Sequence, residues 1–564
     1  MDRAALVAAA RRWAAEDPDP ATAEDLLARA DLADRGDEDA LEDLAGACAG
    51  LLEFGTAGLR GPIGPGPNRM NRAVVIRAAA GLIGYLRQSG ISAPTVVIGR
   101  DARRGSEDFA RDTAAVTVAA GGRALLFDQP RPTPVLAWVI RAQGADAGVM
   151  VTASHNPAPD NGYKVYLGDG RQIVPPADAA IRELMEAAGP AREVPRAAGG
   201  WETLGPEVVE RYVREVASRA GACPPARVAY TAMHGVGAST LRAAFAAAGL
   251  PAPIPVASQD TPDPTFPTVP FPNPEEPGAT DALLALARAT SPDLALALDP
   301  DADRCAVAVP DPGAASATDP SGWRLLTGDE LGALLAWDIA AREPVTGDST
   351  FARSIVSGRL IDAIAHAAGR RCEETLTGFK WIARTPGLRY GYEEAIGYCV
   401  APALVADKDG IATALAAASL VGRLTALGRS VPDVLDELAV RHGVHATGAF
   451  SVRVEALHLI DVLMERLRSD TPTRAELAGI PVLRIDDLAD PPPGGLPPTP
   501  GLRYLLADSS RVIARPSGTE PKLKVYLETV TAPPARSDLG KAREEAAARL
   551  ERLRAALEDL TRLP

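Results

Sequence analysis

Three carboxylates follow a short apolar run of the chain at alternate positions. The segment reads Asp299-Pro-Asp-Ala-Asp-Arg304, so Asp299, Asp301 and Asp303 are spaced i, i+2 and i+4. Oxygen ligands with this spacing can converge on a hard cation. An EF-hand would need glycine at the sixth loop position and glutamate at the twelfth, where this chain has Arg304 and Pro310. We therefore expect Mg²⁺ here, with positions left for a phosphate oxygen; a solvated acidic turn is the alternative.

A second polar turn follows the apolar run that ends at Val151 and reads Thr152-Ala-Ser-His-Asn-Pro157. Side chains at the ends of parallel strands face the edge of the sheet where ligands bind. Adjacent side chains diverge in extended or turn geometry, so we do not expect His155 to act as the base for Ser154 in a hydrolase triad. The chain also has no G-x-S-x-G elbow. The alternative interpretation is a turn stabilised by its own side chains.

A third segment, Arg515-Pro-Ser-Gly-Thr-Glu-Pro-Lys-Leu-Lys524, combines an arginine, two hydroxyls, a glycine and two lysines. The guanidinium fork can make paired hydrogen bonds to a phosphate, and hydroxyl and backbone N–H groups can fill its other acceptors. It is not a Walker A loop, because no G-K-[ST] occurs in the chain. The segment predicts a phosphate-binding loop.

The elements that must position these loops have the alternation of α/β domains. Short apolar or β-branched runs are followed by turns with Gly or Asp and then by Ala/Leu/Arg-rich helical segments. Residues 1–50 have apolar residues at helical spacing, and residues 537–560 form an amphipathic helical pattern. The runs expected to be strands include 95–98, 147–151, 227–230 and 294–298.

Composition bounds the class of protein. The 564 residues correspond to three or four domains, and 46% hydrophobic with 23% charged residues is ordinary for a soluble chain. A formal charge of −14 argues against nucleic acid and an anionic membrane as partners. Five scattered cysteines, no 18-residue apolar run and no basic start before a long apolar stretch predict a cytoplasmic protein. Of the 59 basic residues only six are lysines.

Together the three segments resemble the α-D-phosphohexomutase family (phosphoglucomutase/phosphomannomutase). A fourth segment, Gly391-Tyr-Glu-Glu-Ala-Ile-Gly-Tyr398, resembles its sugar-recognition loop, and the four occur in the family's order. The resemblance implies an α/β fold with four domains around a central cleft, three related α/β domains and a smaller C-terminal α+β domain. The expected division is a helical N-terminal extension 1–50, a phosphoserine-loop domain 51–205, a metal-binding domain 206–322, a sugar-recognition domain 323–446 and a phosphate-binding domain 447–564.

The resemblance also implies a mechanism. Ser154 would carry a phosphoryl group and pass it to a sugar monophosphate, and the resulting sugar 1,6-bisphosphate would turn round and rephosphorylate Ser154. Lys164 matches the family's general acid/base, which would need a lowered pKa. The resemblance assigns Ser154, His155, Lys164, Arg60 and Arg304 to catalysis; Ser154, Asp299, Asp301 and Asp303 to Mg²⁺; Glu393, Glu394 and Lys380 to the sugar; and Arg515, Ser517, Gly518, Thr519 and Lys524 to the non-transferring phosphate.

One departure concerns the sugar. The common pattern Glu-x-Ser is Glu-Glu-Ala here, so Ala395 cannot donate a hydroxyl contact. Together with the length and the N-terminal extension, this resembles a longer subgroup that includes phosphoglucomutases, phosphopentomutases and sugar-bisphosphate synthases. We expect a mutase of glucose 1- and 6-phosphate, monomeric or homodimeric. The alternatives are a phosphopentomutase or phosphomannomutase, a sugar-1,6-bisphosphate synthase and a non-catalytic phosphosugar-binding protein.

Overall fold

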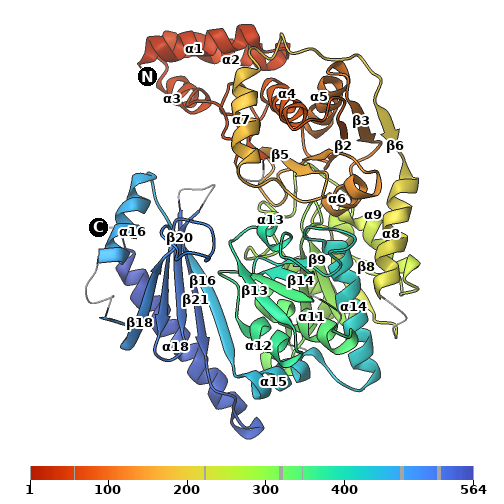
Figure 1. Ribbon diagram of the computed structural model, residues 1–564, viewed down its shortest axis with the longest axis vertical. Helices are drawn as coiled ribbons and strands as arrows, with labels where there is room; N and C mark the ends of the chain where they lie inside the picture. The colour runs from red at the N-terminus through yellow and green to blue at the C-terminus, as the bar shows by residue number, and fades with distance from the viewer. Residues whose placement is uncertain are drawn as a thin grey trace. The chain divides into compact units, whose positions relative to one another are not determined.

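The computed structural model describes residues 2–55, 58–220, 224–316, 322–345, 347, 349–469, 475–517 and 522–562. It divides the chain into two compact units. Unit 1 comprises Met1–Leu325 and Gly397–Arg423, and unit 2 comprises Leu326–Ile396 and Leu424–Pro564. Figure 1 shows the elements of each unit along the chain.

Unit 1 begins with three helices, α1 (Arg3–Glu16), α2 (Pro20–Asp34) and α3 (Glu38–Ala47), drawn in red in Figure 1. Each starts at an aspartate whose carboxylate accepts a hydrogen bond from a backbone N–H of the first turn, which stabilises the helix end. Leu6 and Leu26 belong to the same apolar cluster as Val74 and Ile181 of the following domain. The N-terminal helices therefore extend the first core rather than forming one of their own.

The first sheet of unit 1 has six strands in the order β1-β5-β4-β2-β3-β6. Strands β2, β3, β4 and β6 are parallel, and β5 and β1 join antiparallel. Every residue of β4 is buried, as expected for a strand covered on both faces. Its elements are β1 (Gly58–Pro62), α4 (Arg72–Gln88), β2 (Thr95–Arg100), α5 (Ser106–Ala119), β3 (Arg123–Phe127), α6 (Thr133–Ala142), β4 (Ala147–Val151), β5 (Asp160–Leu167), α7 (Ala177–Ala187) and β6 (Glu202–Leu204).

The second sheet of unit 1 has the order β11-β10-β9-β7-β8. Its central strand β9 is again wholly buried, and it runs parallel to β7. The carboxyl ends of β4 and β9 lead directly into the serine turn and the aspartate turn. The elements are α8 (Pro206–Ala220), β7 (Val228–Thr231), α9 (Gly237–Ala247), β8 (Ile254–Pro255), α10 (Asp281–Thr290), β9 (Leu294–Leu298), β10 (Cys305–Pro310) and β11 (Trp323–Leu325), with β15 (Gly397–Cys399) and the start of α14 (Gly410–Ala426) later in the chain.

Unit 2 contains a parallel sheet in the order β13-β12-β14 and a C-terminal antiparallel sheet in the order β16-β21-β20-β19-β18-β17. The long helix α18 packs on β21 and β16 through Ala546, Leu550, Leu553 and Leu557, which recur at helical spacing. The elements are α11 (Gly328–Arg342), β12 (Thr350–Ser354), α12 (Leu360–Ala367), β13 (Arg371–Thr375), α13 (Phe379–Ile382), β14 (Leu388–Glu393), α15 (Val431–His442), β16 (His445–Arg453), α16 (His458–Ser469), β17 (Glu476–Leu477), β18 (Ile480–Asp487), β19 (Leu502–Leu506), β20 (Arg511–Pro516), β21 (Lys522–Val530) and α18 (Leu539–Leu560).

The α/β fold class predicted from the sequence is confirmed, and each of the four runs expected to be strands forms one. Within the described ranges, no single helix has both the length and the apolarity to cross a membrane, although the bent pair α14 and α15 reaches both when taken together.

Helix α4 packs closely against α7, and two of its glycines differ in the space that this packing leaves beside them. A Cβ on Gly81 would lie 2.7 Å from the carbonyl oxygen of Ile181 and 2.8 Å from the amide nitrogen of Met185, both backbone atoms that cannot move cheaply. A Cβ on Gly84 would meet only side-chain carbons of Leu184, at 3.5 Å or more. We expect G81A to lower the free energy of unfolding by about 1–3 kcal/mol.

The matched variant G84A should be neutral or stabilising by up to about 1 kcal/mol, because alanine is the better helix former. Chemical denaturation followed by circular dichroism measures both. Equal stabilities of the two variants would contradict the close contact of α4 with α7.

Candidate active site

Ser154 lies in the turn that follows β4, and the turn holds it in an unusual conformation. Its φ is 53°, a left-handed value that residues other than glycine seldom adopt. Its backbone N–H donates to Oγ1 of Thr152 at 2.8 Å. Ser154 as a residue is 3% exposed, and its hydroxyl donates to Oδ2 of Asp299 at 2.7 Å. The turn after β4 thus delivers one hydroxyl to the aspartate turn after β9.

Asp299, Asp301 and Asp303 are each at most 2% exposed, and one carboxylate oxygen from each lies within 4.8 Å of the other two. Burial, reinforced by the charges of Asp301 and Asp303, raises the pKa of Asp299 to about 8. Burial also raises the pKa of Asp301, but the adjacent Lys164 ammonium outweighs it, and the net pKa of Asp301 is lowered. Three carboxylates buried this close together destabilise the folded state unless nearby cations compensate their charge.

The donor set fits a hard divalent cation. One oxygen of Asp301 and one of Asp303 (Oδ1 in each) are buried and have no hydrogen-bond partner in the part of the chain that the structure describes. The other oxygen of Asp301 accepts from the Thr133 hydroxyl at 2.6 Å, at the start of α6. Such an outer contact fixes the orientation of a ligating carboxylate. The buried aspartate group can therefore hold a metal ion, as the sequence predicted.

Two lysines compensate this charge within the protein itself. Nζ of Lys164, on β5, lies 2.7 Å from Asp301 Oδ2 and 2.9 Å from Asp303 Oδ2. The expectation of a lowered pKa for Lys164 is wrong for this arrangement: burial lowers it, but the two carboxylates outweigh burial and the net pKa is raised. Nζ of Lys408 lies 3.5 Å from Asp303 Oδ2. The sequence did not lead us to predict Lys408 as a site residue. Because the chain has only six lysines among 59 basic residues, each lysine was a candidate for the site.

Arg304 and His155 complete the surroundings of the serine. Nε of Arg304 donates to Asp299 Oδ2 at 3.2 Å, and its NH1 group to Glu275 at 3.1 Å. Nδ1 of His155 lies 3.2 Å from Ser154 Oγ. The expectation that these adjacent side chains diverge is therefore wrong, because the left-handed backbone of Ser154 brings them together. Burial and the positive charges of Arg304 and Arg60 lower the pKa of His155 well below its ordinary value, so its ring is neutral.

Arg60 reaches the same turn from β1. Its NH1 group donates to Oδ1 of Asn156 at 3.1 Å. Unit 1 thus brings together all the residues that sequence analysis assigned to catalysis and to the metal, namely Ser154, His155, Lys164, Arg60, Arg304, Asp299, Asp301 and Asp303.

The expected sugar residues lie in unit 2, with Glu393 and Glu394 at the end of β14 and Lys380 in α13. The carboxylate of Glu394 accepts from the hydroxyls of Ser354 at 3.0 Å and Ser357 at 2.9 Å, so it already has partners within the protein. Glu393 precedes it as the last residue of β14 and is partly exposed. Lys380 is buried with its Nζ 5.6 Å from the ring centroid of Trp381. Glu393 and Glu394 are both partly exposed, so either carboxylate can meet a ligand.

The expected phosphate loop also lies in unit 2, between β20 and β21. Arg515 is paired across the sheet with Lys524, and the backbone N–H of Ser517 donates to the carbonyl of Lys522 at 2.9 Å. Gly518 and Thr519 lie outside the described residues. Two of the basic side chains predicted to hold a phosphate therefore start from neighbouring strands of one sheet.

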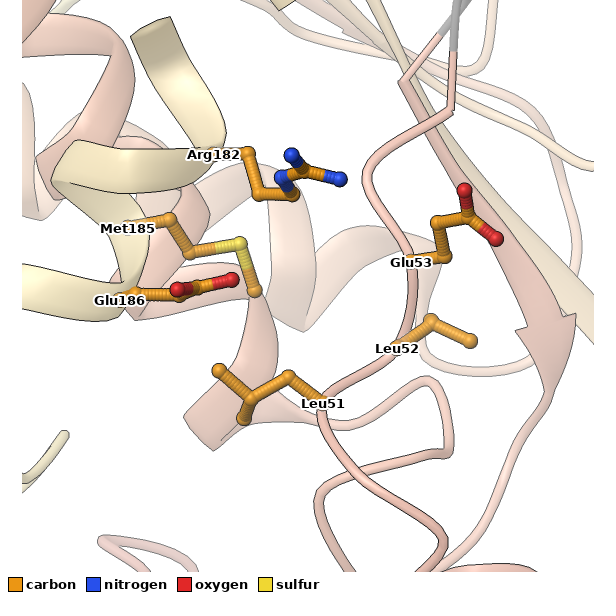
Figure 2. A pocket seen from close by; sticks show the side chains of 6 residues that line it. All are labelled: Leu51, Leu52, Glu53, Arg182, Met185 and Glu186. Atoms are coloured by element: carbon orange, nitrogen blue, oxygen red, sulfur yellow. The ribbon is translucent and has the colours of Figure 1, made fainter. Parts of the chain in front are cut away.

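A cavity of about 200 Å³ in unit 1 shares no residue with these groups. Figure 2 shows Arg182, Met185 and Glu186 of α7 on one side and Leu51, Leu52 and Glu53 on the other. The charged side chains at its mouth are exposed. The cavity is therefore separate from the group formed by Asp299, Asp301 and Asp303.

Comparison with known proteins gives an ordered set of matches. Residues 51–192, 210–313 and 327–441 match the models described as phosphoglucomutase/phosphomannomutase alpha/beta/alpha domains I, II and III, and residues 467–537 match the C-terminal domain. The four matches together cover well over half of the chain.

Individual relatives cover most of the chain as well. It is 45% identical over 467 residues to a Haemophilus influenzae protein named "Probable phosphomannomutase", covering 81% of this chain and 93% of the relative. It is 34% identical to the phosphopentomutase of Homo sapiens, over 89% of each chain. A phosphoglucomutase/phosphomannomutase family protein from Burkholderia thailandensis has the same fold, with a TM-score of 0.68, 20% identity and coverage of 90% of this chain and 97% of that one.

Glu394 gives a prediction for the pH dependence of stability. Burial and the nearby charges of Glu393 and Asp329 raise its pKa from 4.5 to about 7. The folded state therefore holds a proton that the unfolded state has lost between these two values, so this group costs stability progressively as the pH rises through that window. Compared with the wild type, E394Q should gain about 1–2 kcal/mol of unfolding free energy between about pH 4.5 and about pH 7.

Urea denaturation at several pH values measures this gain, with E544Q at an exposed position of α18 as the control for loss of one charge. A difference between E394Q and the wild type that stays constant with pH would show that Glu394 keeps an ordinary pKa.

Proposed function

The chain belongs to the phosphoglucomutase/phosphomannomutase family and is a phosphosugar mutase, and we propose that it interconverts glucose 1-phosphate and glucose 6-phosphate through a phosphorylated Ser154. One observation carries the assignment of Ser154. Its hydroxyl lies 2.7 Å from Asp299, inside a buried group of three carboxylates. A hydroxyl held against a metal-binding group is placed to carry a phosphoryl group, whose charge the metal would offset.

Asp299, Asp301 and Asp303, with an oxygen of the phosphate on Ser154, would hold Mg²⁺. Bound there, Mg²⁺ neutralises negative charge on the transferring phosphoryl group. Arg304 adds a fixed positive charge, because its guanidinium is already oriented by Asp299 and Glu275. Phosphoryl transfer depends mainly on such positioning and charge neutralisation, and this part of unit 1 supplies both.

The transfer step breaks the bond between phosphorus and Ser154 Oγ and forms one between phosphorus and the sugar hydroxyl. The proton of that hydroxyl must end on Ser154 Oγ. We assign its passage to Lys164 Nζ and to His155 Nδ1, which lies 3.2 Å from Ser154 Oγ. The neutral His155 ring would accept the proton of the sugar hydroxyl, and the Lys164 ammonium would donate a proton to Ser154 Oγ. On the return transfer to Ser154 both proton moves reverse, so the two groups regain their starting states. Arg60 holds the turn through Asn156.

The sugar 1,6-bisphosphate formed in this step would turn round and return its other phosphoryl group to Ser154. Glu393, with Lys380, would bind sugar hydroxyls. Arg515, Ser517 and Lys524 would bind the phosphate that is not being transferred, because paired strands carry them at one end of the C-terminal sheet. Glu394 would bind the sugar together with Glu393, with its carboxylate oriented by the hydroxyls of Ser354 and Ser357. Gly518 and Thr519 are proposed for the phosphate loop from the sequence alone.

A pentose phosphate is the second candidate substrate. Ala395 removes the hydroxyl of the common Glu-x-Ser pattern, and the human relative at 34% identity is named a phosphopentomutase. A site with one hydrogen bond fewer to the sugar discriminates less strongly between a hexose and a pentose.

Replacing Ser154 tests the proposed nucleophile. S154A should lower mutase turnover by at least about 10³-fold, and intact-mass analysis should find a phosphatase-labile phosphoryl group on the wild type but not on the variant. S89A, which removes a hydroxyl bonded to the Tyr85 carbonyl at the end of α4, controls for loss of a serine elsewhere. Full activity of S154A, or active wild-type protein that never carries phosphate, would refute the phosphoserine route.

The sugar is tested with glucose, mannose, ribose and deoxyribose 1-phosphates, each with Mg²⁺ and a catalytic amount of bisphosphate. Glucose 1-phosphate should give the highest kcat/KM, and A395S should raise the glucose-to-ribose ratio by about 3- to 10-fold by restoring one hydrogen bond. Equal rates on all four sugars would defeat the preference for glucose. Faster bisphosphate formation from an acyl phosphate donor would favour a synthase.

A further inference from the structure

Arg103 contacts the serine turn and belongs to the segment Gly99-Arg-Asp-Ala-Arg103, which begins in the last two residues of β2. Its side chain is 1% exposed. The two terminal nitrogens of its guanidinium donate to four backbone carbonyls of one turn. These are the carbonyls of Ser154 and Asn156, each at 2.6 Å, Pro157 at 2.8 Å and Asp160 at 3.1 Å.

The guanidinium is itself held in place from two sides. Nε of Arg103 lies 3.2 Å from a carboxylate oxygen of Asp101. The other oxygen of Asp101 accepts from the backbone N–H of Arg103 at 2.9 Å and from the Ser106 hydroxyl at 2.7 Å. The ring of Phe266, from the loop between β8 and α10, lies over the guanidinium at 4.8 Å. Arg103 is therefore a fixed part of the scaffold, and the turn is built on it.

This arrangement accounts for the backbone of Ser154. A left-handed conformation persists in a serine only where the surroundings over-determine it. Here the carbonyl of Ser154 itself and those of three later residues are fixed by one planar cation. Lysine could not replace it, because an ammonium is a compact point charge and cannot span four acceptors as the guanidinium fork does.

We infer that Arg103 is a positioning residue of the mutase reaction, which holds the Ser154 turn so that Oγ stays directed at Asp299. The inference rests on the proposed role of Ser154 as the phosphorylated residue. Arg103 touches backbone carbonyls of the turn, and its effect on the reaction passes through the geometry of Ser154. Phe266 shields the guanidinium from water and so keeps its hydrogen bonds to the turn.

The test compares R103K with R77K. Arg77 is a matched control: it is buried, donates to the carbonyls of Met185 at 3.3 Å and Glu186 at 3.2 Å, and lies 5.6 Å from the ring centroid of Trp13. Both variants replace a buried arginine that binds backbone carbonyls beside an aromatic ring, but Arg77 contacts α7 instead of the serine turn. A merely structural role for Arg103 predicts the same behaviour for both.

We expect R103K to lower kcat by about 100-fold, as small misplacements of reacting groups do, with KM for the sugar phosphate within about 3-fold of the wild type. R77K should keep kcat within about 2-fold. Amide hydrogen exchange of the peptide that covers residues 152–160 should be at least about 10-fold faster in R103K than in R77K or the wild type.

Exchange as slow in R103K as in the wild type, or the same loss of kcat in R77K, would overturn the inference. F266L provides a second variant if R103K does not fold: it should speed exchange of the same peptide and lower kcat in the same direction, and unchanged values would count against the inference. Wild-type protein without phosphate on Ser154 would defeat the proposed function instead. The exchange measurement would still decide whether Arg103 holds the turn.

Discussion

The burial of three acidic side chains in one place is the constraint on which the rest of unit 1 depends. Asp299, Asp301 and Asp303 are almost completely removed from water, and no fold keeps such a group without cations around it. Lys164 and Lys408 supply two of these cations and Arg304 a third. Each comes from a different segment, so the folding of both sheets of unit 1 is needed to complete the group. Among the described residues, Oδ1 of Asp301 and Oδ1 of Asp303 have no hydrogen-bond partner, so the group can also hold a metal ion.

Unit 2 also contains a buried carboxylate whose charge is compensated by arginines. Glu528 of β21 is 1% exposed, and its Oε2 lies 3.0 Å from Arg511 of β20. Burial raises the pKa of Glu528, but Arg511 and Arg359 outweigh it and the net pKa is lowered. Arg511 also donates to the carbonyl of Ser357 at 2.6 Å, and the Ser357 hydroxyl donates to Glu394. The proposed sugar loop and the strand that carries Arg515 are thus joined through one buried arginine.

The sequence predicted the parts of the site that local pattern determines. Buried strands followed by Ser154 and by Asp299, Asp301 and Asp303 could be identified from apolar runs and spacing, and the α/β class followed from the same alternation. Lys408 and Thr133 were missed because they reach the aspartates from segments far along the chain. The left-handed backbone that brings His155 to Ser154 and the carboxylates that raise the pKa of Lys164 are likewise consequences of tertiary contacts, which a local pattern does not contain.

The central claim is that Ser154 and the three aspartates form one phosphoryl-transfer group with a metal. The most direct measurement is a crystal structure of the phosphorylated protein with Mn²⁺ in place of Mg²⁺, located by its anomalous scattering. The account predicts one ion bound by an oxygen from each of Asp299, Asp301 and Asp303 and by an oxygen of the phosphate on Ser154. An ion bound elsewhere, or a phosphate on a different residue, would contradict it.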